Sequence, residues 1–92
     1  MAKLYFIAAT DPDDVTRNLD MFVVANDPAQ AHQLWQADDF AEGCFAGPVV
    51  PDAPPLGQGD AMQIFDVSNV DPTKVGIVGW HTELKCVAHV PA

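Results

Sequence analysis

The sharpest local signal in this chain is a helix start at residues 26–30, which read Asn-Asp-Pro-Ala-Gln. The Asp27 carboxylate can accept a hydrogen bond from an amide of the first turn, and Pro28 has the backbone angle of a first helical position. Gln30 can reach back to an amide before the helix, as in a capping box. The segment therefore predicts that a helix begins at Pro28.

The apolar residues that follow recur at the spacing of a helix lying on another layer. Ala31, Leu34 and Trp35 form this stripe, and Gly43 is a natural stop beyond it. We therefore expect the helix to cover about residues 28–41 and to lay Leu34 and Trp35 on a sheet.

Four segments have the length and composition of β-strands, at residues 3–9, 20–25, 61–67 and 84–90. The first is apolar on both alternating faces, which predicts an interior strand. It is expected to form a hairpin with the second strand across an acidic loop. The last segment alternates apolar and polar side chains, which predicts a half-exposed strand whose apolar face holds Leu84, Cys86, Ala88 and Val90.

The order of these segments is strand, strand, helix, loop, strand, strand. It predicts an α+β fold with an antiparallel sheet of about four strands and one helix packed on one face. Residues 47–59 hold four prolines and three glycines, so regular ladders are expected to be largely excluded there, in an ordered loop or a mobile flap. Residues 75–80 add a short apolar run. A chain of 92 residues has room for one core, so residues 1–92 are expected to form a single domain.

The charge of the chain is strongly one-sided. Thirteen acidic residues against four basic ones give a net charge of −9, while the apolar fraction of 49% is enough to build a core. We assign the acidity to a folded surface. Phosphate contacts need Lys or Arg, and the four present are scattered, so we expect no direct binding to nucleic acid or to a membrane. The expected partner is a basic protein or complex that itself binds nucleic acid.

The acidic residues concentrate in residues 11–42, where eight carboxylates against Arg17 leave a net charge of 1 − 8 = −7. Several crowd the predicted helix end, where the macrodipole disfavours each negative charge by about 0.3 kcal/mol or more. Carboxylates placed against a local preference are candidates for binding, and a row of them resembles a phosphate backbone. The alternative is that the acidity serves only solubility. The candidate partner-binding residues are Asp11, Asp13, Asp14, Asp38, Asp39 and Glu42.

No motif in the sequence points to catalysis or to a bound metal or cofactor. A calcium loop would begin at Asp11 and Asp13, but Val15 stands at the next ligand position and Phe22 where the bidentate Glu belongs. The three histidines lack zinc-site spacing, and no nucleophile elbow occurs. We therefore expect no catalytic residue, no metal site and no cofactor.

The cysteines and the hydrophobic runs bear on the compartment. Cys44 and Cys86 match neither a disulfide framework nor a CxxC pair, and we expect both to be buried as small hydrophobes. No charged-then-apolar leader precedes the first strand, and no apolar run approaches the roughly 18 residues of a membrane span. A soluble, cytoplasmic protein with reduced thiols is expected.

In size, acidity and lack of catalytic motifs over its whole length, the chain resembles the small phage-encoded inhibitors of bacterial defence, which include anti-CRISPR proteins and DNA mimics. The resemblance rests on general character, and no residue signature carries it. It implies a stoichiometric inhibitor whose carboxylates occupy the basic side chains of a nucleic-acid-binding complex.

A second hypothesis belongs to another class. In it the chain is a small structural or accessory module, and two copies form a homodimer through an exposed strand or through residues 75–80, with Trp80 as an anchor.

Overall fold

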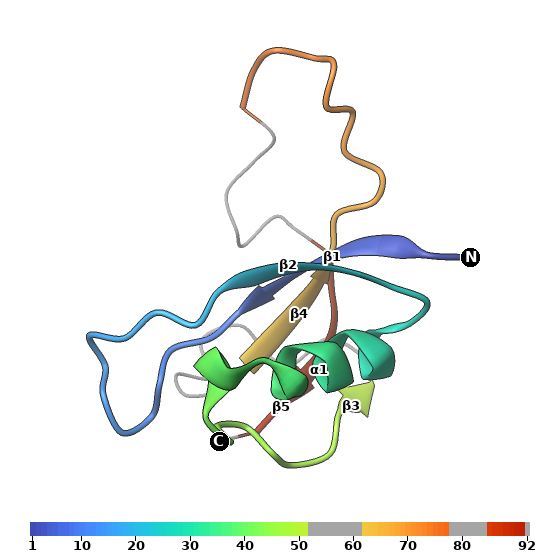
Figure 1. Ribbon diagram of the computed structural model, residues 1–92. Helices are drawn as coiled ribbons and strands as arrows, with labels where there is room; N and C mark the ends of the chain where they lie inside the picture. Colours follow the sequence, from blue (N-terminus) through green and yellow to red (C-terminus); the bar gives the residue numbers. More distant parts are fainter. Residues whose placement is uncertain (52–61, 78–84, 92) are drawn as a thin grey trace.

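A computed structural model of the chain describes residues 1–51, 62–77 and 85–91. These residues form an antiparallel sheet with a helix packed on one face (Figure 1), so the predicted α+β fold is confirmed. The elements are β1 (Lys3–Ala8), β2 (Met21–Ala25), α1 (Pro28–Ala37), the short 3-10 helix η1 (Asp39–Ala41), β3 (Val50–Pro51), β4 (Met62–Asp66) and β5 (Lys85–Val90).

The strand order in the sheet is β2-β1-β4-β5-β3, and all neighbours run antiparallel. β1 lies between β2 and β4, so the prediction of an interior first strand is confirmed. β1 and β2 form the expected hairpin, in a register that pairs Lys3 with Ala25 and Ile7 with Met21. The acidic loop of the sequence thus connects two adjacent strands.

The described residues hold five strands where about four were expected, and the additional one is β3. Val50 and Pro51 pair with β5 inside the proline-rich segment, so the ladder there is limited to two positions of the described part. A proline is tolerated there because β3 is an edge strand with a neighbour on one side only. Residues 52–59 of this segment lie outside the described part.

β5 has the partial exposure expected of the last strand, although it lies inside the sheet. Ala88 and Val90 are buried and Cys86 is half-buried. A register shift beside Ile64 and Phe65 of β4 interrupts the strict alternation. Leu84 lies outside the described residues.

The helix begins where the capping motif predicts. The Asp27 side chain accepts a hydrogen bond from the Gln30 amide at 2.8 Å, and the Gln30 side chain accepts one from the Asn26 amide at 2.7 Å. Pro28 is the first helical residue. The end differs from the prediction, because α1 stops at Ala37 and residues 39–41 form the separate turn η1. The break lies at Asp38, whose ψ of 132° is extended.

The buried face of α1 is rotated from the predicted one. Trp35 is buried as expected, but Leu34 is 49% exposed, and His32 is buried in its place. Residues 31, 32 and 35 lie within about 100° of one another around a helix, whereas residue 34 lies beyond the edge of that arc. His32 is tolerated there because its Nε2 donates to the carbonyl of Phe45 at 2.8 Å.

The core lies between α1 and the facing side of the sheet. Trp35 is 1% exposed in its centre, and its Nε1 donates to the carbonyl of Leu19 at 3.0 Å. This bond ties the helix to the end of the acidic loop. The buried cluster contains Tyr5, Ile7, Ala9, Leu19, Val23, Ala25, Ala31, Trp35, Ala41, Phe45, Met62, Ile64, Ala88 and Val90.

The segment after β4 does not join this core. Residues 68–77 extend away from the sheet (Figure 1), and the side chains of Val75 and Ile77 are fully exposed. The apolar pattern of residues 75–80 therefore forms no strand at 75–77, and residues 78–80, including Trp80, lie outside the described part.

Candidate partner-binding surface

The loop between β1 and β2 is shaped by its own acidic side chains. The ladder of the hairpin continues into it, since the Leu19 amide donates to Ala9 and the Asp11 amide donates to Arg17. The Asp11 carboxylate accepts a hydrogen bond from the Asp13 amide at 2.9 Å. Carboxylates that bind an amide two residues ahead in this way stabilise a tight turn. The loop is therefore ordered by contacts that the sequence encodes locally.

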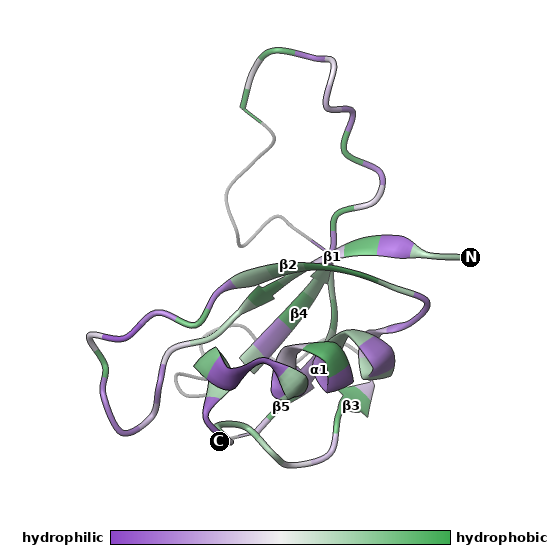
Figure 2. Ribbon diagram, viewed as in Figure 1, coloured by the Kyte–Doolittle hydropathy of each residue, from purple (hydrophilic) through white to green (hydrophobic). Residues whose placement is uncertain are grey.

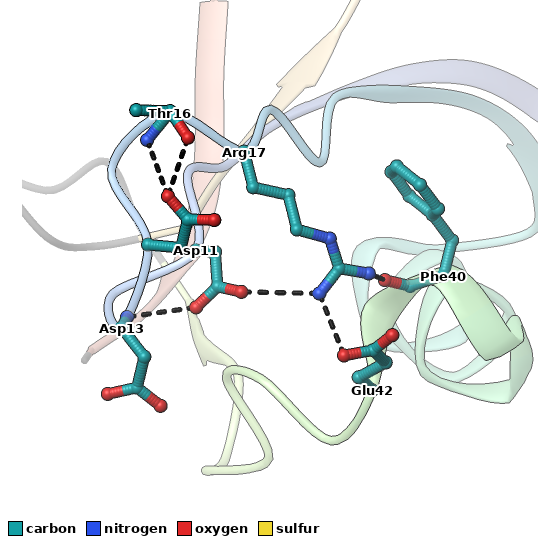
Figure 3. Close-up of polar contacts among 7 residues, drawn as sticks. Asp11, Asp13, Thr16, Arg17, Phe40 and Glu42 are labelled. Atoms are coloured by element: carbon teal, nitrogen blue, oxygen red, sulfur yellow. Dashed lines mark hydrogen bonds and ion pairs between the residues drawn. The ribbon is translucent and has the colours of Figure 1, made fainter.

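Asp14 closes a second turn of the same type. Its carboxylate accepts hydrogen bonds from the amide and the hydroxyl of Thr16, at 3.1 and 2.6 Å. Figure 3 draws the bond between Asp11 and Asp13 and the two bonds of Thr16 as dashed lines. Asp14 itself remains exposed.

Arg17 joins this loop to the end of the helix (Figure 3). One guanidinium nitrogen lies 3.2 Å from Asp11 Oδ2 and 2.9 Å from Glu42 Oε2, and the other donates to the carbonyl of Phe40. The guanidinium also lies over the Phe40 ring, 4.7 Å from its centroid. We call this set of contacts the Arg17 clamp. It brings together residues that are 25 positions apart in the sequence.

The structure explains part of the acidity at the helix end. The Asp38 carboxylate accepts a hydrogen bond from the Phe40 amide at 2.9 Å, so Asp38 caps the N-terminus of η1. Negative charge is favourable at such an N-terminus. Asp38 is also the C-cap of α1, so its charge does lie at the end of that helix, and the cap on η1 gives the carboxylate a structural role there.

The six candidate residues differ in their exposure and in the contacts of their side chains. Asp11 is 7% exposed and holds the loop, whereas the other five are exposed. Asp13 and Asp39 form no side-chain hydrogen bond or ion pair with any other residue in the described part of the chain. The Asp13 carboxylate points away from the clamp in Figure 3. We call the surface formed by residues 11–14 and 38–42 the acidic ridge.

The clamp also affects the titration of its members. The amide of Asp13, together with the guanidinium of Arg17, lowers the pKa of the Asp11 carboxyl below its usual value, despite opposing desolvation. Burial and the neighbouring Asp11 carboxylate raise the pKa of the Cys44 thiol. Cys44 is therefore held as a neutral thiol beside the clamp. It is half-buried and free, where full burial was expected.

An apolar hollow of about 300 Å³ lies between the start of α1 and the β3–β5 edge, lined by Pro28, Val49, Pro51 and Val87 among others. Among the described residues that line it, Asp27 alone is ionisable, and its carboxylate already caps α1. Among residues 1–51, 62–77 and 85–91, no group of three His, Cys, Asp or Glu side chains is arranged to hold a metal ion.

Comparison of the chain with protein-family models, with characterised proteins and with solved structures gave no match. In the part of the chain that the structure describes, no helix combines the length and the hydrophobicity that a membrane crossing requires.

Two residues that matter for this site were not among the sequence candidates. Arg17 and Phe40 form the centre of the clamp, and neither is acidic. The sequence did contain a signal for Arg17: it is the one cation among the eight carboxylates of residues 11–42, so an ion pair with at least one of them was to be expected. Its actual partners depend on where the helix ends, which the spacing pattern placed four residues too late.

Proposed function

We propose that this chain is a non-catalytic acidic binding protein that occupies the basic surface of a nucleic-acid-binding protein or complex. The observation that carries the proposal is the Arg17 clamp. It fixes two acidic segments side by side, and the six candidate carboxylates against one guanidinium leave −6 + 1 = −5 on the ridge. Binding that requires no ordering of the surface loses less conformational entropy.

The distribution of contacts within the ridge supports this function. The carboxylates that shape the fold, Asp11 and Asp38, use their oxygens within the chain. Asp13 and Asp39 flank them and are exposed, with oxygens that a Lys or Arg can approach. The arrangement separates the residues that build the surface from those that present charge.

The resemblance to small phage-encoded inhibitors of bacterial defence suggests the kind of partner. A DNA mimic of this kind would place its carboxylates on the Lys and Arg side chains of a groove that normally holds a phosphate backbone. On this chain the filling surface is the ridge, and the proposed outcome is stoichiometric inhibition of an effector complex in the cytoplasm.

The test is capture of a partner from a host-cell lysate that has been treated with nuclease. The expected partner is a basic protein that the chain releases when salt is raised from about 50 to about 200 mM, and that short duplex DNA or RNA displaces. The double variant Asp13→Asn, Asp39→Asn is expected to weaken the complex by roughly tenfold, which corresponds to about 1.4 kcal/mol.

A matched control separates the position of the charge from its amount. The variant Val75→Lys, Ile77→Lys changes the net charge from −9 to −9 + 2 = −7, as Asp13→Asn, Asp39→Asn does, but at exposed residues away from the ridge. It is expected to keep nearly full affinity. Equal weakening by both variants, or a partner that nucleic acid does not displace, contradicts the proposal.

A further inference from the structure

The two edges of the sheet are built differently. β3 has two residues, one of them Pro51, and proteins use short strands and prolines to prevent pairing at an edge. β2 has five residues, Met-Phe-Val-Val-Ala, with no charge, proline or glycine. A strand of this composition at a free edge is a template for another strand.

The main-chain groups of β2 that face this free edge can be identified from the hairpin register. The Leu19 amide donates to Ala9, and the Asp11 amide donates to Arg17, so the odd-numbered residues bond across the hairpin. The same register continues along β1 and β2. In an antiparallel pair the intervening residues direct both their N–H and C=O groups outward. On β2 these are Phe22 and Val24.

Side chains cap the edge beyond these two residues. The Asp20 amide donates to Asn18 Oδ1 at 3.0 Å, and the Asn26 amide donates to the Gln30 side chain at 2.7 Å. Between these two caps, the N–H and C=O groups of Phe22 and Val24 have no partner in the described part of the chain. The open edge is therefore limited to one short stretch.

We propose that two copies of this chain join through this edge by antiparallel β2–β2 pairing, centred on Val23. In this register Phe22 lies opposite Val24 of the second copy, and each such pair exchanges two hydrogen bonds. All the outward groups of Phe22 and Val24 are then satisfied. If the register were shifted by two residues in either direction, the new pairing would need the amide of Asp20 or of Asn26. Each of these amides already donates to a side chain of its own chain.

The side chains of this edge also fit a second copy. Phe22 is 67% exposed and Val24 is 62% exposed, and a Phe opposite a β-branched residue is a favourable cross-strand pair. The Phe6 ring lies 4.9 Å from that of Phe22 and supports it from β1. Figure 2 shows β2 in the hydrophobic colour, whereas the adjoining loop is largely hydrophilic.

The charges at the ends of β2 favour the antiparallel direction. In the proposed register, Asp20 lies opposite Asn26 of the second copy, and Asp27 lies opposite Leu19. A parallel arrangement in register would place Asp20 beside its own counterpart. Like charges directly opposite destabilise a strand pair, so two acidic chains can meet here without facing carboxylates.

The test begins with sedimentation of the purified chain over about 1 to 500 µM, because a small interface of this kind predicts a dimer with a Kd on the order of micromolar. Val24→Pro is expected to abolish the dimer, since it removes an outward amide and leaves the hairpin bonds in place. Val24→Thr keeps the amide and the β-branched shape, so it is expected to dimerise. Leu4→Lys changes the residue of β1 that lies beside Val24 and leaves the β2 edge intact, so this variant is also expected to dimerise.

A cross-link reads the register directly and does not depend on Val24→Pro folding. In a background with Cys44→Ser and Cys86→Ser, Val23→Cys is expected to give an oxidised dimer, because the two Cα atoms would lie about 4.5 Å apart. Phe22→Cys is expected to give little, since its own counterpart lies diagonally at about 7 Å or more.

Three results would overturn the dimer. They are a monomer at every concentration, loss of the dimer in Leu4→Lys but not in Val24→Pro, or a cross-link at Phe22→Cys but not at Val23→Cys. Salt separates this inference from the proposed function. Pairing of two acidic chains does not weaken as salt rises, whereas binding of a basic partner does.

Discussion

Replacing Trp35 by Ala is expected to lower the free energy of unfolding by about 3–5 kcal/mol. Trp35 is 1% exposed between α1 and the sheet, and its loss leaves a cavity beside Phe45. It also removes the donor to the Leu19 carbonyl. Because a small domain has only about 5–15 kcal/mol of stability in total, this loss is a large share of it, and the urea midpoint should fall markedly. Urea denaturation followed by circular dichroism measures the change.

The adjacent residue provides a matched control. Leu34→Ala removes an apolar side chain from the same helix at a site that is 49% exposed, and it is expected to cost about 1 kcal/mol or less. Trp35→Phe keeps a ring but leaves the Leu19 carbonyl without its donor, for an expected loss of about 1–3 kcal/mol. A larger loss for Leu34→Ala than for Trp35→Ala would contradict the rotated helix face.

Replacing Arg17 by Met is expected to lower the melting temperature by several degrees at neutral pH and to loosen the acidic ridge. The substitution keeps an aliphatic stem, but the Asp11 and Glu42 carboxylates and the Phe40 carbonyl lose their shared donor. Asp11 is 7% exposed and cannot regain full hydration in place. Arg17→Lys keeps the charge without the planar fork, and its melting temperature is expected to be intermediate.

The effect of Arg17→Met is expected to depend on pH. The pKa of Asp11 is lowered in the folded chain, first by the Asp13 amide and further by Arg17, so the stability that Arg17 contributes through Asp11 is present above the unfolded pKa of about 3.9 and is lost as pH falls through the lower folded pKa. The wild type and Arg17→Met should therefore differ most above about pH 5 and converge in acid. Melting curves of both proteins, recorded from pH 3 to pH 7 in steps of about one pH unit, measure this difference. A constant difference across that range would show that the ion pairs do not hold the clamp.

Together, the two proposals predict where the acidic ridges would lie in the dimer. The acidic loop leads directly into the start of β2, and antiparallel pairing sets the starts of two strands at opposite ends of the shared edge. A five-residue strand is about 17 Å long, so the dimer would carry one ridge near each end of the joined strands. Each ridge would remain free for a basic partner.

The sequence predicted those elements whose causes lie within a few residues. The cap of α1 is made by Asp27 and Gln30, which are three positions apart, and the apolar runs of β1 and β2 suit strands by their own composition. The hairpin follows because the two runs are consecutive. Local signals were sufficient for the fold class and for the helix start.

Local signals did not predict where α1 ends or which of its faces is buried. Asp38 leaves the helix because its side chain caps η1, and that turn is anchored when Arg17 bonds the Phe40 carbonyl. His32 replaces Leu34 in the core because a carbonyl 13 residues away accepts its proton. Spacing alone favours the more hydrophobic residue, since the acceptor is supplied by a distant part of the chain.

The contrast between local and tertiary causes also applies to the acidic ridge and to the β2 edge. The sequence by itself determined the charge of the acidic segment and the apolar composition of β2, because these depend on residue identity alone. The turns made by Asp11 and Asp14 were not predicted, although their partners lie only two residues away. Only the tertiary structure decided that Arg17 joins two acidic segments 25 residues apart, that Asp11 is buried and that β2 is the open edge. The physical reason is that burial, ion pairing and strand exposure depend on which groups lie opposite one another after folding.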